Sequence, residues 1–313
     1  MIYIYGPPRT HCYFIQIMKA MCHEFKQLNY NCEIIIGMNE KYIEYKSLKK
    51  SICVDDNKDT IEKTNKKEKP NNKNTIIIFG FHDVYRVNKF IDFIKKFNVI
   101  VYNSEQLHTG SWRNFVKTLP TMEYVNQIWD YSLNNIKILN EKGIKNTTHI
   151  PIGYSDGFVI DKHAENRKND SILFIGNRNI RRKNKIEDIN KLENLEEKAV
   201  FLRGVWGEKY NNRVRENTLF LNIHFYPKPI LEVFRIIPLL CNGCNVLSEY
   251  SKDENLDKML SKYVGFFKED LSNFVEVKNN YVKNREKLFE DFKNEMKFSD
   301  LIKKSGILDH ILG

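Results

Sequence analysis

Short apolar runs alternate along this chain with longer stretches in which apolar residues recur at helical spacing. The runs Thr75–Gly80 and Ser171–Ile175 are apolar at nearly every position, as are strands buried on both faces of a parallel sheet. Between such runs, His11–Leu28 repeats apolar residues three and four positions apart, which predicts a helix with one buried face. Strands and helices that alternate in this way predict an α/β protein with parallel sheets.

The first half of the chain carries one group of predicted elements. The predicted strands are Met1–Tyr5, Cys32–Gly37, Thr75–Gly80, Val99–Tyr102, Ile128–Ser132 and Thr148–Pro151, and the predicted helices are His11–Leu28, Val87–Phe97, Trp112–Leu119 and Asn134–Lys142. A charged, Asn-rich stretch over residues 55–74 predicts a mobile insertion in this half. After it, Ile152–Asp170 has no strong periodicity and predicts a linker.

The pattern then restarts. The second group of predicted strands is Ser171–Ile175, Ala199–Leu202, Thr218–Ile223, Asn245–Ser248 and Tyr263–Phe267, and helices are predicted from Lys183 towards Leu195, at Glu208–Asn217, Ile230–Cys241 and Asp253–Leu260, and over most of Leu271–Lys304. Pro238 is expected to kink its helix or to move the helix start. We therefore predict two Rossmann-like domains, residues 1–165 and 166–313, facing each other across a cleft.

Composition supports two domains, because single cores rarely grow beyond about 250–300 residues and this chain has 313. The formal charge of +10 suits an anionic partner such as a nucleotide, a phosphate, an acidic glycan or a membrane surface touched peripherally. The sequence has no zinc module, helix-turn-helix or RNA-binding signature, so we expect no specific nucleic-acid partner. Six scattered cysteines and the lack of a long apolar run predict a cytoplasmic location.

Four cations follow the strand Ser171–Ile175 within the loop Gly176–Lys183: Arg178, Arg181, Arg182 and Lys183. Backbone N–H groups at a helix start attract phosphate, and arginine adds paired hydrogen bonds. The alternative is a basic face on a solvated helix. Because the strand end fixes the position of the loop, we predict phosphate binding around Gly176.

A second polar group, His224, Tyr226 and Lys228, follows the strand Thr218–Ile223 and leads into Glu232. We predict a nucleotide pocket here, in which an aromatic ring stacks on the base and the carboxylate accepts ribose hydroxyls. Glu232 and Arg235 are three residues apart and share a helical face. The alternative is that Glu232 is a helix-start carboxylate, favoured by the helix dipole and paired with Arg235.

These residues resemble a known family. The order strand–GNRNIRR–helix, followed by LNIHFYPKPILEVFRIIPLLCNGCNVLSE, resembles nucleotide-sugar glycosyltransferases with two facing Rossmann domains, the GT-B fold; YNSEQL, IWDYS and HIPIGY are similar to segments of their first domain. The resemblance covers about Thr75–Phe267. It implies a nucleotide-diphosphate sugar in the second domain, with Arg178, Arg181 and Lys228 on the diphosphate, Glu232 on the ribose, and His224 and Tyr226 near the nucleotide. A glycan, lipid-linked or protein acceptor would enter from the first domain.

The resemblance also implies metal-independent transfer with no cofactor beyond the donor, because basic side chains and helix dipoles neutralise the leaving diphosphate in such enzymes. The pair Asp55–Asp56 lacks the Asp-x-Asp spacing of metal-dependent enzymes, so we expect no metal site. Cys241 and Cys244 form a lone CxxC pair, which we expect to fill the core.

One departure from the family pattern leaves the reaction open. Many relatives carry two glutamates at a fixed interval, but the residue seven before Glu232 is Phe225 and the residue seven after it is Leu239. The stereochemistry is therefore undetermined, and a catalytically inactive glycan- or nucleotide-binding protein of the same fold is the alternative.

An inverting reaction would need a general base from the first domain. Asp83 and Glu105 each lie just beyond a predicted strand end and are the candidates, with His82 and His11 behind them.

Overall fold

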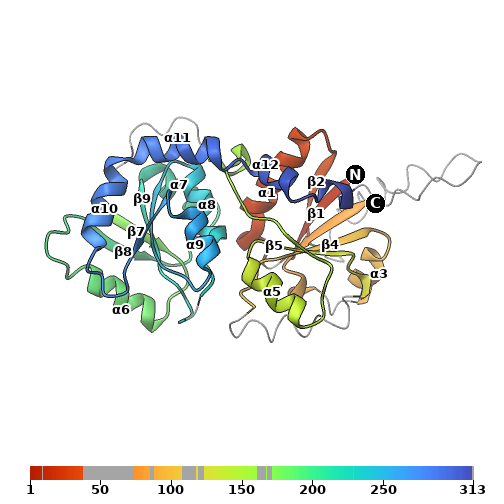
Figure 1. Ribbon diagram of the computed structural model, residues 1–313, viewed down its shortest axis with the longest axis horizontal. Coiled ribbons are helices and arrows are strands. Elements are labelled where there is room, and N and C mark those ends of the chain that lie inside the picture. The colour runs from red at the N-terminus through yellow and green to blue at the C-terminus, as the bar shows by residue number, and fades with distance from the viewer. Residues whose placement is uncertain are drawn as a thin grey trace, which may run out of the picture.

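The computed structural model describes residues 1–8, 10–37, 74–84, 88–107, 118, 123–160, 167, 171–227 and 229–311. Three predictions fall outside these residues: nearly all of the 55–74 insertion, nearly all of the helix at Trp112–Leu119, and the domain boundary between residues 165 and 166. In the described chain, helices pack around one six-stranded and one five-stranded sheet, and Figure 1 shows the two units side by side. Every strand pair is parallel, which confirms the predicted α/β class with two Rossmann-like units.

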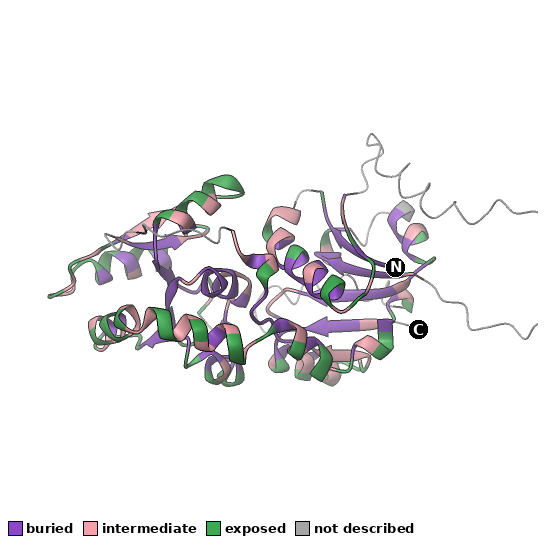
Figure 2. Cartoon of the chain, turned by 90° about the horizontal axis from the view of Figure 1, so that it is seen from above, coloured by how far each residue is buried: buried purple, intermediate pink, exposed green. Residues whose placement is uncertain are grey.

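The first sheet has the order β2-β1-β3-β4-β5-β6. Its strands are β1 (Ile2–Gly6), β2 (Cys32–Ile36), β3 (Thr75–Phe79), β4 (Asn98–Asn103), β5 (Gln127–Asp130) and β6 (Thr147–His149), and its helices are α1 (His11–Gln27), α3 (Asn88–Ile94) and α5 (Leu133–Glu141). Because side chains alternate across a strand, Ile76 and Ile78 of β3 join one apolar cluster and Ile77 and Phe79 join another. Figure 2 shows these strands buried, with the exposed residues on the surrounding helices.

The second sheet has the order β11-β10-β9-β7-β8. Its strands are β7 (Ser171–Ile175), β8 (Lys198–Leu202), β9 (Leu219–Asn222), β10 (Asn245–Glu249) and β11 (Val264–Phe267), and the helices that follow them are α6 (Ile180–Ile189), α7 (Glu208–Glu216), α8 (Val233–Cys241), α9 (Glu254–Leu260), α10 (Phe274–Lys283) and α11 (Arg285–Glu295). All eleven strands of the described chain match predicted ones, with ends that differ by at most two residues.

The largest apolar cluster runs through both domains. It joins Phe14 and Met18 of α1 to Ile236 and Ile237 of α8, so one face of the first sheet and the central helix of the second share a core. Cys241 and Cys244 are buried in the same cluster, in agreement with the prediction that they fill the core. This continuity holds the two sheets in one orientation.

The start of α8 differs from the prediction. The helix begins at Val233 instead of Ile230, and the Ile230 N–H, ahead of the helix, donates to Gln106 Oε1 of the first domain at 3.0 Å. Glu232 is therefore the residue that precedes the first turn. Pro238 lies inside α8.

The C-terminal end of the chain returns to the first domain. The predicted long helix over Leu271–Lys304 is broken at Lys297, whose extended backbone separates α11 from α12 (Phe298–Lys304). At this crossing the Tyr154 N–H donates to Met296 O at 2.6 Å, and the Phe298 N–H donates to Tyr154 O at 2.8 Å. Figure 1 shows α12 lying beside α1, with the two chain termini close together. After α12 comes α13 (Leu308–Ile311), where the Thr75 hydroxyl of β3 donates a hydrogen bond to Ile311 O at 2.9 Å.

No helix in the described part of the chain combines the length and apolar character needed to cross a membrane.

We predict that the α12 crossing contributes to the stability of the whole molecule. Phe298 is fully buried, so Phe298→Ala should lower the free energy of unfolding by about 3–5 kcal/mol, as large-to-small core changes do. The matched control is Lys303→Ala on the exposed face of the same helix, which should change it by less than about 0.5 kcal/mol. Urea unfolding of both variants measures the difference, and equal stabilities would show that α12 is only loosely attached.

Candidate functional site

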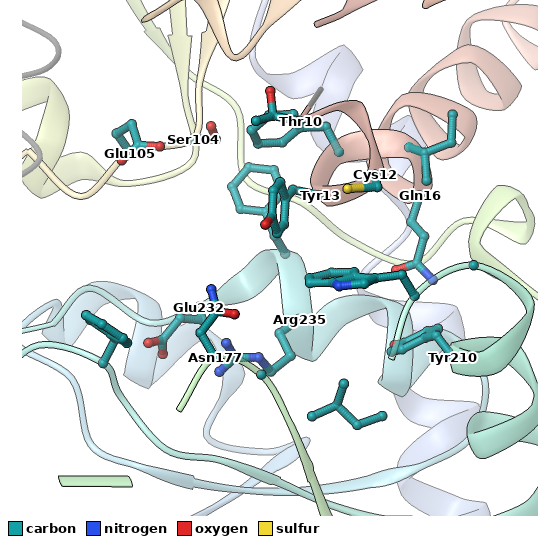
Figure 3. Close-up of a pocket in the computed structure, with 18 of the residues that line it drawn as sticks. Thr10, Cys12, Tyr13, Gln16, Ser104, Glu105, Asn177, Tyr210, Glu232 and Arg235 are labelled. Atoms are coloured by element: carbon teal, nitrogen blue, oxygen red, sulfur yellow. The ribbon is translucent and has the colours of Figure 1, made fainter. Parts of the chain in front are cut away.

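A cavity of about 550 Å³ lies between the carboxyl ends of the two sheets. The first domain contributes Thr10, Tyr13, His82, Asp83 and Glu105 to its lining, and the second contributes Gly176, Asn177, Arg182, Glu232 and Arg235. Figure 3 shows Ser104 and Glu105 on one side of the cavity and Glu232 and Arg235 on the other.

The strand order explains why these loops meet. In the first sheet β1 lies between β2 and β3, and in the second β7 lies between β8 and β9. From one of two neighbouring central strands the chain continues towards one edge of the sheet, and from the other it continues towards the opposite edge. This place is called a topological switch point, and the crevice that it leaves is where open α/β sheets bind ligands. Thr10 and Asp83 follow β1 and β3, and Gly176 and Glu232 follow β7 and β9. The cavity thus joins the switch points of both sheets.

Glu232 is the central acid of the second-domain wall. Its Oε2 accepts from His224 Nδ1 at 2.6 Å and from Asn222 Nδ2 at 3.0 Å, and its Oε1 lies 3.9 Å from Arg182 Nη2. Burial by itself raises the pKa of Glu232, but the charge and hydrogen bond of His224 and the charge of Arg235 outweigh it and lower the pKa to about 2. The carboxylate is therefore ionised at neutral pH.

His224 lies beneath this carboxylate and is 1% exposed. Its Nε2 is 3.1 Å from Glu249 O and 3.2 Å from Tyr250 O, and carbonyl oxygens can only accept hydrogen bonds. With an ionised acid at Nδ1 as well, both ring nitrogens must carry protons. Burial lowers the pKa of His224, but the charge and hydrogen bond of Glu232 overcome this and the net direction is upward. His224 is thus an imidazolium that positions Glu232.

Two arginines complete this wall, Arg182, which is buried, and Arg235, which is half-buried. Arg182 stacks on Phe174 and Phe225, with 5.0 and 5.1 Å from its guanidinium carbon to the ring centroids, and Arg235 Nη1 donates to Asn222 Oδ1 at 2.6 Å. Burial, together with the charge of Arg235, lowers the pKa of Arg182 to about 9, and burial lowers the pKa of Arg235. Both remain cations at neutral pH. In the described lining, the second-domain wall thus presents two guanidinium groups and one carboxylate, Glu232, so its charge is positive.

The other cations of the predicted phosphate loop lie away from the cavity. Arg181 donates to both oxygens of Glu249, at 2.6 and 2.8 Å, and to His224 O at 2.9 Å. Arg178 is exposed to solvent, Lys183 lies 3.4 Å from Glu187 on α6, and none of the three lines the cavity.

Three further predicted residues are absent from the lining: His224, described above, Tyr226 and His11. Tyr226 is half-buried and packs edge-on against Phe225, at 5.1 Å between ring centroids, and His11 Nδ1 lies 3.1 Å from Pro8 O. Lys228 lies outside the described residues.

The predicted catalytic candidates come together on the first-domain wall. His82 Nε2 lies 3.6 Å from Asp83 Oδ1 and 3.8 Å from Glu105 Oε1, and the Thr10 hydroxyl donates to Asp83 Oδ2 at 2.5 Å. Gly80, with φ of 62°, turns the chain at the end of β3 into the 3₁₀ turn Phe81–Asp83 that brings these side chains to the cavity. Burial raises the pKa of Glu105; the charge of His82 opposes this and that of Asp83 adds to it. We call His82, Asp83 and Glu105 the acidic cluster.

Sequence reasoning missed Asn222, a fully buried residue at the end of β9. Its amide donates to Glu232 and to Ser248 Oγ, both at 3.0 Å, while its Oδ1 accepts from Arg235. It therefore fixes the acid and the arginine relative to each other. The available signal was a single asparagine inside the apolar run Thr218–Ile223. Tyr13, Trp206 and Tyr210, which also line the cavity, were missed because aromatic residues at these positions suggest ordinary packing.

Among the residues that the structure describes, no three His, Cys, Asp or Glu side chains are grouped so that they could hold a metal ion.

No protein-family model and no curated protein matches the sequence. Solved structures are nevertheless similar over nearly the whole chain. HepE of Anabaena, in complex with UDP and glucose, has a TM-score of 0.55 and 10% identity, covering 100% of this chain and 99% of that one. WaaG, a glycosyltransferase involved in lipopolysaccharide biosynthesis, has a TM-score of 0.53 and 7% identity, covering 98% and 99%. A glycosyltransferase from Rickettsia africae has a TM-score of 0.53 and 12% identity, covering 99% and 98%. Similarity at such low identity shows a shared fold, which is the GT-B fold expected from the sequence.

The buried pair of His224 and Glu232 predicts a pH-dependent stability. The pKa of Glu232 lies below its ordinary 4.5. Its ionised form therefore stabilises the folded protein above that pH, and this stabilisation is lost as the pH falls through the lowered pKa. The pKa of His224 lies above its ordinary 6.5. Its protonated form therefore stabilises the folded protein below that pH, and this stabilisation is lost as the pH rises through the pKa that His224 has in the folded protein. The loss of unfolding free energy in His224→Ala, about 3 kcal/mol, should therefore be largest between about pH 4.5 and 6.5.

Urea unfolding at about pH 5.5 and about pH 9 checks this prediction. The control is His224→Gln, which keeps an N–H donor for Glu232 but no titratable charge. If wild type and His224→Ala differ by the same amount at both pH values, the imidazole does not carry the charge that we assign to it.

Proposed function

We propose that this chain is a glycosyltransferase that moves a sugar from a nucleoside-diphosphate sugar to an acceptor hydroxyl. The observation that carries the proposal is the pairing, across one cavity on a GT-B fold, of a wall with the buried Arg182 and the half-buried Arg235 and a wall with an acidic cluster. The first suits a diphosphate and the second suits removal of a proton.

On the second-domain wall, Arg182 and Arg235 would hold the diphosphate, with the Gly176–Asn177 turn ahead of α6 beside them. Both guanidinium groups are desolvated without a full set of counter-charges, so a bound anion recovers part of that cost. Glu232, an ionised acceptor held in place by His224, would receive the ribose hydroxyls. Arg181 is neutralised by Glu249, so we do not assign it to the donor.

On the first-domain wall, we assign Glu105 as the base that takes the proton of the sugar-accepting hydroxyl. Asp83 raises the pKa of Glu105 and His82 lowers it. The hydroxyl oxygen then forms a bond to the anomeric carbon while the bond from that carbon to the diphosphate breaks. The electrons of the broken bond go to the diphosphate, whose charge the arginines balance. The scheme needs no divalent cation and no cofactor besides the donor.

HepE holds UDP and glucose in its crystal structure, so UDP and UDP-sugars are the first ligands to test. A thermal-shift screen with UDP, GDP, CDP and their sugars would identify the donor, because a ligand that binds the folded state raises its stability. If none of them raises the midpoint, the proposal fails.

A second candidate is a binding protein that holds the donor without transferring the sugar. It is favoured by Phe225, which stands seven residues before Glu232, where many related enzymes carry a glutamate, and lines the cavity. Donor binding without release of the nucleotide, over a panel of acceptors, would establish this alternative.

We predict that Arg235→Gln weakens UDP binding by about tenfold or more, since charge-assisted hydrogen bonds contribute about 1.5–3 kcal/mol. The glutamine amide can still donate to Asn222. Arg178→Gln removes the same charge outside the cavity and should leave the affinity within about twofold. Isothermal titration calorimetry measures both variants, and equal losses would mean that only the overall charge attracts the nucleotide.

We also predict that Glu105→Gln lowers kcat by about 100-fold or more while UDP binding persists. Because the pKa of Glu105 is raised, the wild-type rate should increase with pH through that raised value, and the variant should lose this limb of the profile. Asp83→Asn is the comparison. Asp83 would be the base if Asp83→Asn lost more kcat than Glu105→Gln and if the rate of Glu105→Gln still rose with pH as the wild-type rate does.

A further inference from the structure

Two exposed aromatic side chains meet in the cavity, one from each domain. Tyr13, in the first turn of α1, is 47% exposed, and Trp206, in the loop between β8 and α7, is 42% exposed. Their ring centroids lie 4.8 Å apart with an angle of 85° between the planes. Large apolar surface left open to water inside a concavity is typical of a ligand site.

Backbone geometry presents Trp206 to the cavity. Gly204 and Gly207 bracket it with φ values of 68° and 56°, which residues with a side chain rarely adopt. No atom lies within 4 Å of the position that a Cβ would take at either glycine. The loop is therefore bent by its own conformation, and Trp206 extends from it to pack edge-on against Tyr13 of α1.

Polar groups surround the aromatic pair. Gln16 and Lys19 of α1 and Tyr210 and Asn211 of α7 also line the cavity. An aromatic face with amide and hydroxyl groups at its edge complements a pyranose ring, which has apolar C–H faces and a hydroxyl rim. A lipid chain would leave these polar groups unpaired.

We propose that this arm of the cavity, between α1 and α7, is an acceptor subsite for a saccharide that stacks on Trp206 and Tyr13. The inference rests on the proposed function, because the arm opens into the cavity that would hold the donor. Figure 3 shows Tyr13 between Glu105 on one wall and Arg235 on the other, with Tyr210 farther along the second wall. A sugar on this platform can direct one hydroxyl between the base and the diphosphate.

The chemistry of the step is a glycosyl transfer. The saccharide hydroxyl gives its proton to Glu105, its oxygen bonds to the anomeric carbon of the donor, and the donor's carbon–oxygen bond breaks with its electron pair leaving on the diphosphate. The product is an oligosaccharide one sugar longer and a free nucleoside diphosphate.

The test titrates the full chain with methyl glycosides and disaccharides of glucose, galactose, mannose and N-acetylglucosamine. The chain has three tryptophans, so the titration uses Trp112→Phe as the parent, in which Trp206 and the fully buried Trp129 remain. Its emission should change on binding and should not change once Trp206→Phe is added. By calorimetry, Trp206→Ala and Tyr13→Ala should each weaken binding of the best saccharide by about tenfold, whereas Trp206→Phe should retain most of the affinity. The matched control is Tyr250→Ala, an aromatic that is 58% exposed outside the cavity.

UDP binding, measured separately by thermal shift, distinguishes this inference from the proposed function. A chain that binds a saccharide through Trp206 but no nucleotide loses the proposed function and keeps the subsite as a saccharide site. Three results would overturn the inference: no saccharide of the panel binds, the best one binds Trp206→Ala as tightly as wild type, or UDP alone changes the Trp206 emission and competes with the saccharide. The last would mean that the arm holds the nucleobase.

Discussion

The ion pair between the His224 imidazolium and the Glu232 carboxylate is the interaction on which the candidate site depends. Their side chains are only 1% and 14% exposed, so neither charge can be left without its partner. Losing one partner of such a pair costs about 3–5 kcal/mol, far more than an exposed salt bridge contributes. Through Asn222 the pair also sets the position of Arg235. One buried contact therefore controls both the acid and the cation that face the cavity.

This arrangement leaves the second-domain wall with more positive than negative charge. Arg182 and Arg235 both lose hydration when the protein folds. Among the described residues of the second domain that line the cavity, Glu232 is the one acid that lies beside them. A folded protein accepts such an imbalance where a ligand supplies the missing charge. The neighbouring Arg181 shows the contrast, because Glu249 neutralises it within the protein. Two adjacent residues of α6 thus differ: Arg181 is paired with an acid within the protein, and Arg182 lines the cavity.

The fold brings three chemically different surfaces to one cavity. Parallel strands deliver the cationic wall after β7 and β9 and the acidic cluster after β3 and β4. The helices α1 and α7 add an aromatic arm that needs both domains to be complete. The core shared by α1 and α8 and the return of α12 to the first sheet keep these surfaces facing each other. A change in the angle between the sheets would separate the aromatic pair, because its two rings come from different domains.

The sequence alone determined the class of fold and the places where polar side chains leave the sheets. Strands buried on both faces are almost wholly apolar, and parallel topology puts their carboxyl ends on one rim, so Asp83, Glu105, Gly176 and Glu232 could be assigned to a cleft. Only the tertiary structure decided which of two adjacent arginines faces it. Arg181 and Arg182 point in different directions from α6, and the partner that captures Arg181 is Glu249, 68 residues further along the chain. The roles of Asn222 and Trp206 were decided in the same way, because burial and contacts between distant segments do not appear in local patterns.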